Sequence, residues 1–307
     1  MTEISSSPSP KISCIVNPQA ANKKWQRRKN IKKYLRRNLP CDIIDFQESK
    51  QHTIELAKKL SLDHDVMVAV GGDGTVADVI QGIIEAKKGN QVALAILPLG
   101  SGNAFRKSLR IPKNFKKALD LIQEGKTKEI DLIMIEGKTA GFASIGATAK
   151  ISQKKLQYNI PGLWGHLLAA RIMPRLPRRE SEIELLEGLD DAGQPFHKKT
   201  FRLKFFDCVI GKTNYFGYNW KVAPLAKIDD GFLDITFFKT KAIKYLFMFP
   251  LTYFGLSQKF QKHFKAKKMI LRGKKLPIQY NGEFLAEREE IQIKVLPRAL
   301  RVIGSGA

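Results

Sequence analysis

The stretch VMVAVGGDGTVADVIQGI, residues 66–83, decides the fold of this chain. Its first five residues are apolar without alternation, which predicts a strand buried on both faces of a parallel sheet. Gly71, Gly72 and Gly74 then surround the single carboxylate of Asp73, and the residues that follow have helical apolar spacing. A strand, a glycine turn and a helix in this order are typical of a phosphate-binding turn, because glycine admits a close approach and a helix N-terminus offers unpaired N–H groups.

The same alternation of apolar runs and helical patterns occupies the first third of the chain. The runs ISCIV, DIIDF, VMVAV and ALAIL are each followed by a helical pattern, which predicts an α/β fold with a Rossmann-like parallel sheet covered on both faces. From about Glu129 onward, many short strands bounded by Gly, Asn and Asp predict a mostly antiparallel β-sandwich with helical insertions. We therefore expect a disordered lead at 1–10, an α/β domain at 11–130 and a β-sandwich domain at 131–307, whose last residues could return to the first domain.

Three loops at the predicted carboxyl edge of the parallel sheet have the composition of a phosphate cradle. They are NPQAAN (17–22), GGDGT (71–75) and PLGSGNAF (98–105), and ligands of parallel sheets bind outside the carboxyl ends of the strands. Asp73 does not suit an anion cradle alone, since a carboxylate repels phosphate. It fits if a Mg²⁺ ion lies between them or if it meets a hydroxyl group. The alternative is an ordinary Asp-Gly turn residue.

The charge balance indicates a polyanionic partner. The 307 residues include 53 Lys and Arg against 29 Asp and Glu, a formal net charge of +24. Nucleic acid, an anionic membrane surface or a phosphorylated substrate would suit such a chain, but it has no helix-turn-helix, zinc finger or RNP-like motif, so we expect no nucleic acid. The longest apolar run, 245–256, is interrupted by Pro250 and falls short of the roughly 20 residues that cross a bilayer. Three separated cysteines favour a reducing cytoplasm over a disulfide or zinc framework.

Four motifs in the same order resemble the diacylglycerol kinase catalytic domain family, which includes bacterial soluble lipid kinases, sphingosine kinases and ceramide kinase. They are IVNPQA (15–20), VAVGGDGTVADVIQGI (68–83), ILPLGSGNAF (96–105) and DDGFLDI (229–235). The resemblance implies ATP-dependent transfer of the γ-phosphoryl group to a lipid hydroxyl, in a cleft between a nucleotide-binding α/β domain and a lipid-substrate β-sandwich domain. A diacylglycerol-like lipid is the default acceptor, and a sphingoid or other long-chain alcohol is the alternative.

The resemblance also implies which residues form the site. Asp73 would lie near Mg²⁺ or the acceptor hydroxyl. Asp229 and Asp230 would hold a structural Mg²⁺ together with backbone carbonyl groups, and the alternative for this pair is a hairpin turn at Asp230-Gly231 between two strands. The nucleotide would be lined by Asn17, Pro18, Gln19, Ala20, Ala21, Gly71, Gly72, Asp73, Gly74, Thr75, Asp78, Gly100, Ser101, Gly102 and Asn103.

The family's Asp-Gly-Glu signature near the C-terminus reads Asn281-Gly282-Glu283 in this chain. Asn-Gly is the strongest two-residue hairpin signal, so the turn is preserved while one negative charge is lost. A carboxylate can take the proton of the attacking hydroxyl as a general base and an amide cannot, so we assign the base to Glu283. Asn281 and the NPQAAN loop, which lacks the usual glycine, leave a second hypothesis open: a lipid- or nucleotide-binding member with weakened catalysis.

Two basic segments could contact an anionic membrane. Lys and Arg crowd the predicted helix from Lys23 to Leu39, for which a solvated helix face is the alternative. The segment LWGHLLAARIMPRLPRR (163–179) combines apolar residues such as Trp164 with adjacent arginines, which is typical of a helix at a lipid interface. An ordinary helix packed on the sandwich is the alternative. We expect a cytoplasmic protein in peripheral contact with the membrane that carries its lipid substrate. The sequence leaves open whether the protein forms a homodimer.

Overall fold

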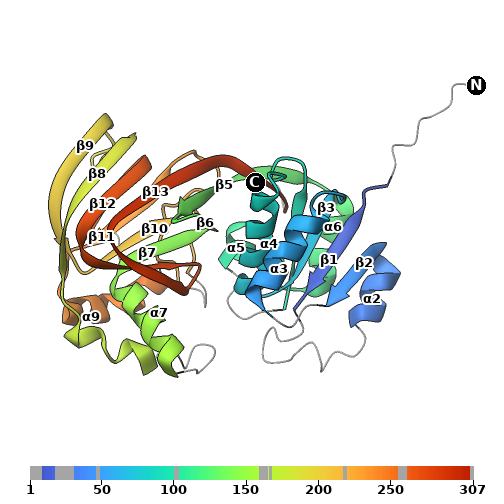
Figure 1. The fold of residues 1–307 in the computed structure, drawn as a ribbon, viewed down its shortest axis with the longest axis horizontal. Coiled ribbons are helices and arrows are strands. Elements are labelled where there is room, and N and C mark those ends of the chain that lie inside the picture. The colour runs from blue at the N-terminus through green and yellow to red at the C-terminus, as the bar shows by residue number, and fades with distance from the viewer. Residues whose placement is uncertain are drawn as a thin grey trace, which may run out of the picture. The chain divides into compact units, whose positions relative to one another are not determined.

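The computed structural model describes residues 9–17, 31–45, 49–99, 104–158, 165, 168–216, 220–254 and 261–304. The chain forms two compact units (Figure 1). The first comprises residues 1–100, 111–128 and 300–307, and the second comprises residues 101–110 and 129–299. The second unit thus resumes at Glu129, where the sequence pattern changes, and the predicted disordered lead falls mostly on residues outside the described ranges.

The first unit is built on a parallel sheet in which the order of the strands reverses along the chain. Its strands are β1 (Ile12–Val16), β2 (Cys41–Asp45), β3 (Val66–Gly71) and β4 (Ala93–Pro98). They pair in parallel in the order β2-β1-β3-β4, and the end of β13 (Glu283–Ile303) adds Arg301 and Val302 beside β4. Because β2 and β3 lie on opposite sides of β1, the connections after β1 and β3 leave the sheet in opposite directions.

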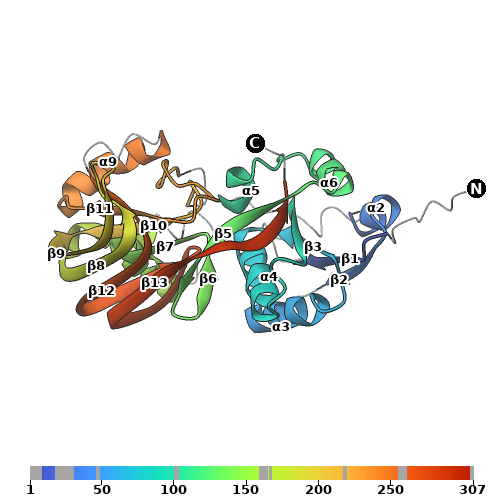
Figure 2. The same cartoon turned by 90° about the horizontal axis from the view of Figure 1, so that it is seen from above.

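Helices cover both faces of this sheet. They are α2 (Ile31–Asn38), α3 (Lys50–Leu60), α4 (Asp73–Glu85) and α6 (Phe115–Glu124). Figure 2 shows α3 and α4 on one side of the strands and α2 and α6 on the other. Gly82 of α4 permits the close packing with α3, since a Cβ there would lie 2.5 Å from the carbonyl oxygen of Ile54. Ser49 and Asn114 accept backbone N–H groups at the starts of α3 and α6, as N-cap residues do.

The second unit consists mainly of antiparallel strands, as predicted. They are β5 (Thr127–Ile135), β6 (Lys138–Ala140), β7 (Phe142–Gly146), β8 (Arg179–Leu189), β9 (Pro195–Phe205), β10 (Asp207–Gly211), β11 (Leu233–Phe238), β12 (Lys262–Tyr280) and β13. Strands β5 and β13 also reach into the first unit. The long strand β12 pairs with β7, β8, β11 and β13, and its register with β13 shifts between Arg272 and Leu276.

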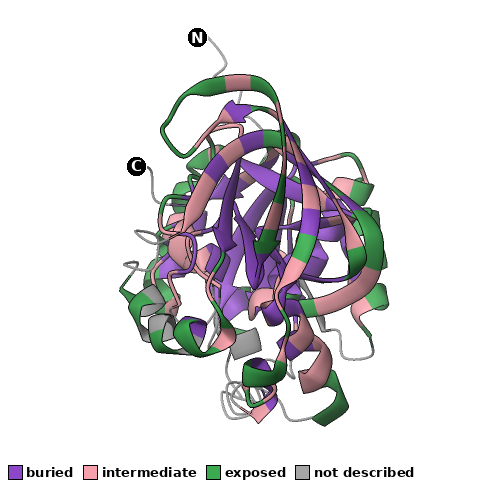
Figure 3. Cartoon of the chain, turned by 90° about the vertical axis from the view of Figure 1, so that its left-hand side faces the viewer, coloured by how far each residue is buried: buried purple, intermediate pink, exposed green. Residues whose placement is uncertain are grey.

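Two apolar cores hold this unit together. The larger lies between the strands and includes Phe205, Phe237 and Phe264, and it appears as the buried interior of the strands in Figure 3. The smaller covers the opposite face of β10 and β11, where Phe206 and Phe238 meet α7 (Ala147–Tyr158), α9 (Ala242–Tyr253) and the 3-10 turn η1 (Met173–Arg175). This double cover explains why β10 and β11 are buried along their whole length, whereas β8 alternates.

Candidate active site: the glycine-rich edge and the Asn-Gly-Glu turn

The described parts of the three predicted phosphate loops begin side by side. The N–H of Asn17, after β1, donates to the carbonyl of Val70 at 3.1 Å, and the N–H of Leu99, after β4, donates to the carbonyl of Gly71 at 3.0 Å. This edge lies where the strand order reverses between β1 and β3, the place where parallel sheets bind ligands. The predicted residues Pro18, Gln19, Ala20 and Ala21, and Gly100, Ser101, Gly102 and Asn103, lie outside the described residues.

The GGDGT loop passes directly from β3 into α4. Gly72 is the N-cap residue and Asp73 is the first helical residue. At Gly71 the chain needs glycine, because a Cβ would lie 2.4 Å from the Oγ1 of Thr75. Gly74, by contrast, is exposed, and nothing lies within 4 Å of a Cβ placed there. The first turn of α4 therefore presents a half-buried carboxylate and an open glycine at a helix N-terminus, where unpaired N–H groups favour an anion.

Asp78 lies one turn further along α4 and is largely buried. The Nζ of Lys50, at the start of α3, lies 3.7 Å from its carboxylate. Sequence reasoning did not select Lys50, and nothing in the local pattern could have, because the helical packing of α3 on α4 brings it to Asp78. The role of Asp78 toward a nucleotide stays a prediction.

The predicted Asn-Gly hairpin turn is present in the second unit. Asn281 and Gly282 have φ values of 48° and 88°, and Tyr280 pairs with Glu283 across the turn between β12 and β13. Both central residues thus adopt the left-handed conformation of the favoured two-residue turn. The buried side chain of Gln279 accepts the N–H of Gly282 at 2.8 Å and donates to Ser144 at 2.9 Å, which fixes the turn against β7.

The side chain of Asn281 holds the connection between β6 and β7. Its Oδ1 accepts the N–H of Gly141 at 3.0 Å, and its Nδ2 donates to the carbonyl of Thr139 at 3.3 Å. An aspartate could make the first contact, but it has no donor for the second. The amide in place of the family's aspartate therefore has a structural explanation in this chain.

Glu283 is exposed at the first residue of β13, next to basic residues of α7. Burial lowers the pKa of Lys155, and the negative charge of Glu283 acts against this shift. Lys150 forms an ion pair with Glu287, whose pKa is lowered by that contact. In the sequence, Lys150 and Lys155 are marked only by the lysine-rich run of α7. Their position beside β13 depends on the fold and could not be predicted from that run.

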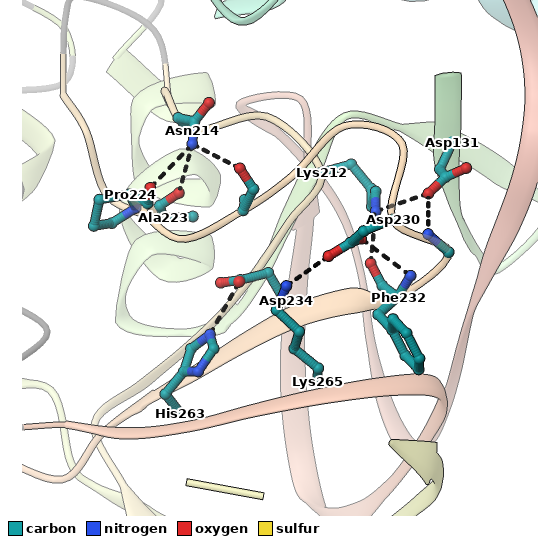
Figure 4. A network of polar contacts seen from close by, with 12 residues as sticks. Asp131, Lys212, Asn214, Ala223, Pro224, Asp230, Phe232, Asp234, His263 and Lys265 are labelled. Atoms are coloured by element: carbon teal, nitrogen blue, oxygen red, sulfur yellow. Dashed lines mark hydrogen bonds and ion pairs between the residues drawn. The ribbon is translucent and has the colours of Figure 1, made fainter. Parts of the chain in front are cut away.

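The DDGFLDI segment is engaged by the protein itself (Figure 4). Asp229 is exposed, whereas Asp230 binds two lysines through its two oxygens: Lys212 Nζ lies 2.7 Å from Oδ1 and Lys265 Nζ lies 2.5 Å from Oδ2. Burial raises the pKa of Asp230, but these hydrogen bonds and charges outweigh it, so the pKa lies below its ordinary value. An Asp230 held in this way does not fit a metal ligand.

The hairpin alternative for this segment is wrong in one respect. Gly231 has φ 76° in a turn, but only one strand, β11, flanks it, and described residues 220–228 contain no strand. The N–H of Gly231 instead donates to the Oδ2 of Asp131 at 2.7 Å. A buried carboxylate of β5, remote in sequence, takes the place of the second strand as its partner.

Comparison with known proteins identifies both parts of the chain. Residues 11–135 match the diacylglycerol kinase catalytic domain, and residues 196–304 match the YegS C-terminal NAD kinase beta sandwich-like domain. A curated protein named diacylglycerol kinase from Staphylococcus saprophyticus is 28% identical over 189 residues, which are 60% of this chain and 57% of that protein. A diacylglycerol kinase of Staphylococcus aureus (strain JH9) is 27% identical over a match of 222 residues, and the match covers 66% of this chain and 66% of that protein. The matches thus span less than two thirds of the curated relatives' length.

A solved structure shows the same fold. The crystal structure of a diacylglycerol kinase from Bacillus anthracis str. Sterne has a TM-score of 0.72 and 21% sequence identity to this chain, and the match covers 98% of both chains. The two matched domains follow one another in the order that the sequence motifs predict. Residues 11–135 of this chain therefore match the diacylglycerol kinase catalytic domain, and the whole chain has the fold of the Bacillus anthracis protein.

Proposed function

We propose that the protein transfers the γ-phosphoryl group of ATP to the hydroxyl group of a lipid, with a diacylglycerol-like lipid as the default acceptor. The GGDGT loop carries the proposal: it starts α4 at the carboxyl edge of a parallel sheet, in a chain with the diacylglycerol kinase catalytic domain. The N–H groups at the start of α4 are suited to phosphate oxygens, and the open space beside Gly74 admits their close approach.

The two units supply different parts of the chemistry. A Mg²⁺ ion bound with the nucleotide would neutralise phosphate charge. Asp73 is our candidate to hold that ion or to orient the acceptor hydroxyl. In the second unit, Glu283 takes the proton of the attacking hydroxyl, and Lys155 adds a positive charge beside it. Catalysis then consists mainly of positioning and charge neutralisation.

A lipid panel tests the reaction and the assignment of the base. Purified protein is incubated with MgATP labelled in the γ-phosphate and with micelles of diacylglycerol, a sphingoid base or a polyprenol. We expect label in diacylglycerol, and Glu283→Gln should lower kcat by about 10²–10⁴-fold, as expected for a general base, with nucleotide affinity unchanged. Glu289→Gln, an exposed glutamate on the same strand, is the matched control. Label in none of the lipids would reject the proposal.

Two alternatives concern the acceptor and the activity. A sphingoid or other long-chain alcohol would appear in the same panel as the preferred acceptor. A family member with weakened catalysis, suggested by Asn281 and by the NPQAAN loop, is the second alternative, and the two backbone contacts of the Asn281 amide give that residue a structural role as well. For a member with weakened catalysis, we expect the protein to bind nucleotide but to transfer no labelled phosphate to any lipid of the panel.

We also propose that the protein acts at an anionic membrane surface, through α9. Ile243, Phe247 and Leu251 are exposed, Phe247 by 77%, and their four-residue spacing places them on one face of the helix. Phe254, also exposed, follows directly after the helix. The opposite face is anchored by Tyr245, which packs on Phe206 and Phe238. No helix in the described ranges is long and apolar enough to cross a membrane.

Basic residues accompany this apolar face. Lys241 and Lys244 on α9 and Arg171 and Arg175 near η1 are exposed, and Arg178 donates to the carbonyl of Lys239 before α9. An apolar face beside cationic side chains suits anionic lipid. In the segment predicted to be interfacial, Met173 is instead buried in the smaller core, which favours the alternative of a packed segment there. Trp164 and residues 23–30 lie outside the described residues.

Vesicle sedimentation tests the membrane contact. We expect binding to vesicles with anionic phospholipid, weaker binding to neutral vesicles, and at least a tenfold loss of affinity in Phe247→Glu/Phe254→Glu. Leu62→Glu, which replaces an apolar residue of similar exposure in the first unit, should bind as the unchanged protein does. Equal loss in both variants would contradict the assignment to α9.

A further inference from the structure

The side chain of Lys212, directly after β10, lies in the interior of the second unit with only 1% of its surface exposed. Its ammonium group contacts three oxygens: Oδ2 of Asp131 at 2.9 Å, Oδ1 of Asp230 at 2.7 Å and the carbonyl of Phe232 at 2.7 Å (Figure 4). An ammonium group has three N–H donors, so each can meet one acceptor. Lys212 is therefore completely coordinated by protein oxygens.

The surrounding charges are balanced. Asp131 is 99% buried, and its oxygens also accept the backbone N–H groups of Gly231 at 2.7 Å and Arg298 at 2.9 Å. Lys265 supplies the second ammonium group, to Asp230. Two carboxylates thus face two ammonium groups, which meets the requirement that buried charges be paired and hydrogen-bonded.

The oxygens around Lys212 are of the kind that a hard divalent cation would take, namely carboxylates and a backbone carbonyl. The family resemblance implies a structural Mg²⁺ in this same DDGFLDI segment. Here the three oxygens already contact an ammonium group, at distances well above the roughly 2.0–2.1 Å of Mg²⁺ coordination. Within the described residues, no group of three or more His, Cys, Asp or Glu side chains could hold a metal ion. The residues present do not fit the ion.

We propose that the ammonium group of Lys212 is the resident cation of this position and that the second unit folds without a structural divalent ion. The lysine ties β10, β5 and the turn before β11 together through Asp131, Asp230 and Phe232. The inference concerns folding and stands whether or not the proposed phosphoryl transfer is correct.

The first experiment uses the unchanged protein in the absence of nucleotide. Metal content is measured by mass spectrometry after mild purification without chelator, and Tm is then recorded after dialysis against EDTA and again with millimolar MgCl2. We expect no stoichiometric divalent ion and the same Tm in both conditions. A divalent ion near one per chain after mild purification, or a Tm that falls in EDTA and recovers with Mg²⁺, would overturn the proposal.

The second experiment removes the cation. Lys212→Met keeps much of the apolar stem, leaves the buried carboxylate of Asp131 without its ammonium partner and leaves Asp230 with Lys265 alone, so we expect Tm to fall by about 6–15 °C. Lys265→Met, which removes a partner of Asp230 that is 19% exposed, is the matched control and should lower Tm less. An equal or larger loss in the control would contradict the central role of Lys212.

A third variant tests whether the position suits a cation. Lys212→Ala leaves room among the three oxygens, so Mg²⁺ at millimolar concentration should raise the Tm of this variant by several degrees while leaving the unchanged protein unaffected. Failure of Mg²⁺ to stabilise the variant would show that the oxygens are not a cation position. If neither variant folds, the measurements on the unchanged protein still decide the main point.

Discussion

The GGDGT loop of the first unit and the DDGFLDI segment of the second are both turns of glycine and aspartate, and sequence reasoning assigned both to phosphate or metal. They differ in the exposure of the glycine that follows the aspartate and in the contacts of Asp230. At the first, Gly74 is exposed beside the half-buried Asp73 at a helix N-terminus. At the second, Asp230 contacts two lysines and Gly231 donates to Asp131. Composition alone does not separate these two turns, whereas the exposure of Gly74 and the two lysines on Asp230 do.

The largest expected effect tests the ligand side of this comparison. Asp73→Asn keeps the shape of the side chain but removes the charge that would hold metal or orient the acceptor, so we expect kcat to fall by about 10²–10³-fold, with Tm changed little. Transfer of labelled phosphate to diacylglycerol and thermal unfolding measure the two quantities. Asp120→Asn, an exposed change on α6, serves as the control. A large fall in Tm with unchanged kcat would make Asp73 a structural residue like Asp230.

A second buried carboxylate of the second unit, Asp207, tests how burial without an ammonium partner affects stability. Asp207, in the second unit, receives hydrogen bonds from Thr148 and from the hydroxyl of Tyr245 at 3.2 Å rather than from ammonium groups. Burial raises its pKa from 3.8 to about 8. Between these values the folded state holds a proton that the unfolded chain has lost, so its contribution to stability is present at low pH and is lost as the pH rises toward 8.

The free energy of unfolding should respond to this by at most about 1.4 kcal/mol per pH unit. Asp207→Asn does not titrate, so the unchanged protein should lose stability relative to this variant from pH 5 to pH 8. Urea unfolding at four pH values measures the difference, which cancels the other titrating groups. Parallel curves for the two proteins would show that Asp207 ionises in the folded state as it does in the unfolded chain.

Substitutions at two glycines of the GGDGT loop are expected to affect stability and nucleotide binding separately. Gly71→Ala should cost about 1–3 kcal/mol of stability, because its Cβ would overlap the side chain of Thr75. Gly74→Ala meets no atom within 4 Å and should be neutral or slightly stabilising, since alanine favours a helix more than glycine does. Its methyl group would, however, occupy the space proposed for phosphate. Calorimetry with MgATP should therefore show a loss of about tenfold in affinity for Gly74→Ala, about 1.4 kcal/mol, and equal affinity would place the phosphates elsewhere.

The sequence predicts those parts of the molecule that depend on local pattern. Unalternated apolar runs predicted the strands of the parallel sheet, and Asn281-Gly282 predicted the hairpin turn. The cluster around Lys212 could not be predicted, because β5, the end of β10 and the turn before β11 come together only in the folded sandwich. A lysine after an apolar strand is indistinguishable in sequence from a solvated one. The exposed face of α9 was hidden for a related reason: its apolar residues resemble core until the structure shows which face packs.

The smallest expected effect concerns Asn281, whose turn could be either structural or ligand-binding. If the position is structural, Asn281→Asp loses the hydrogen bond to Thr139 and places a carboxylate oxygen near that carbonyl group, which should cost about 1 kcal/mol and about 2–4 °C in Tm. Kinase activity should stay within about twofold, an expectation based on the small free-energy change. Asn114→Asp is the control, because either residue can cap α6.

The opposite result would be equally informative. Aspartate at position 281 matches the family's signature, so a rise in kcat at unchanged Tm would place this turn among the ligand-binding ones and support weakened catalysis in the natural chain. A fall in Tm without a gain in kcat would show instead that the amide was retained for its two backbone partners, Gly141 and Thr139. In that case Glu283, the residue directly after the turn, would be the carboxylate here that can act as the base. The replacement of aspartate by asparagine would then change the structural contacts of the turn and leave the chemistry of the reaction unchanged.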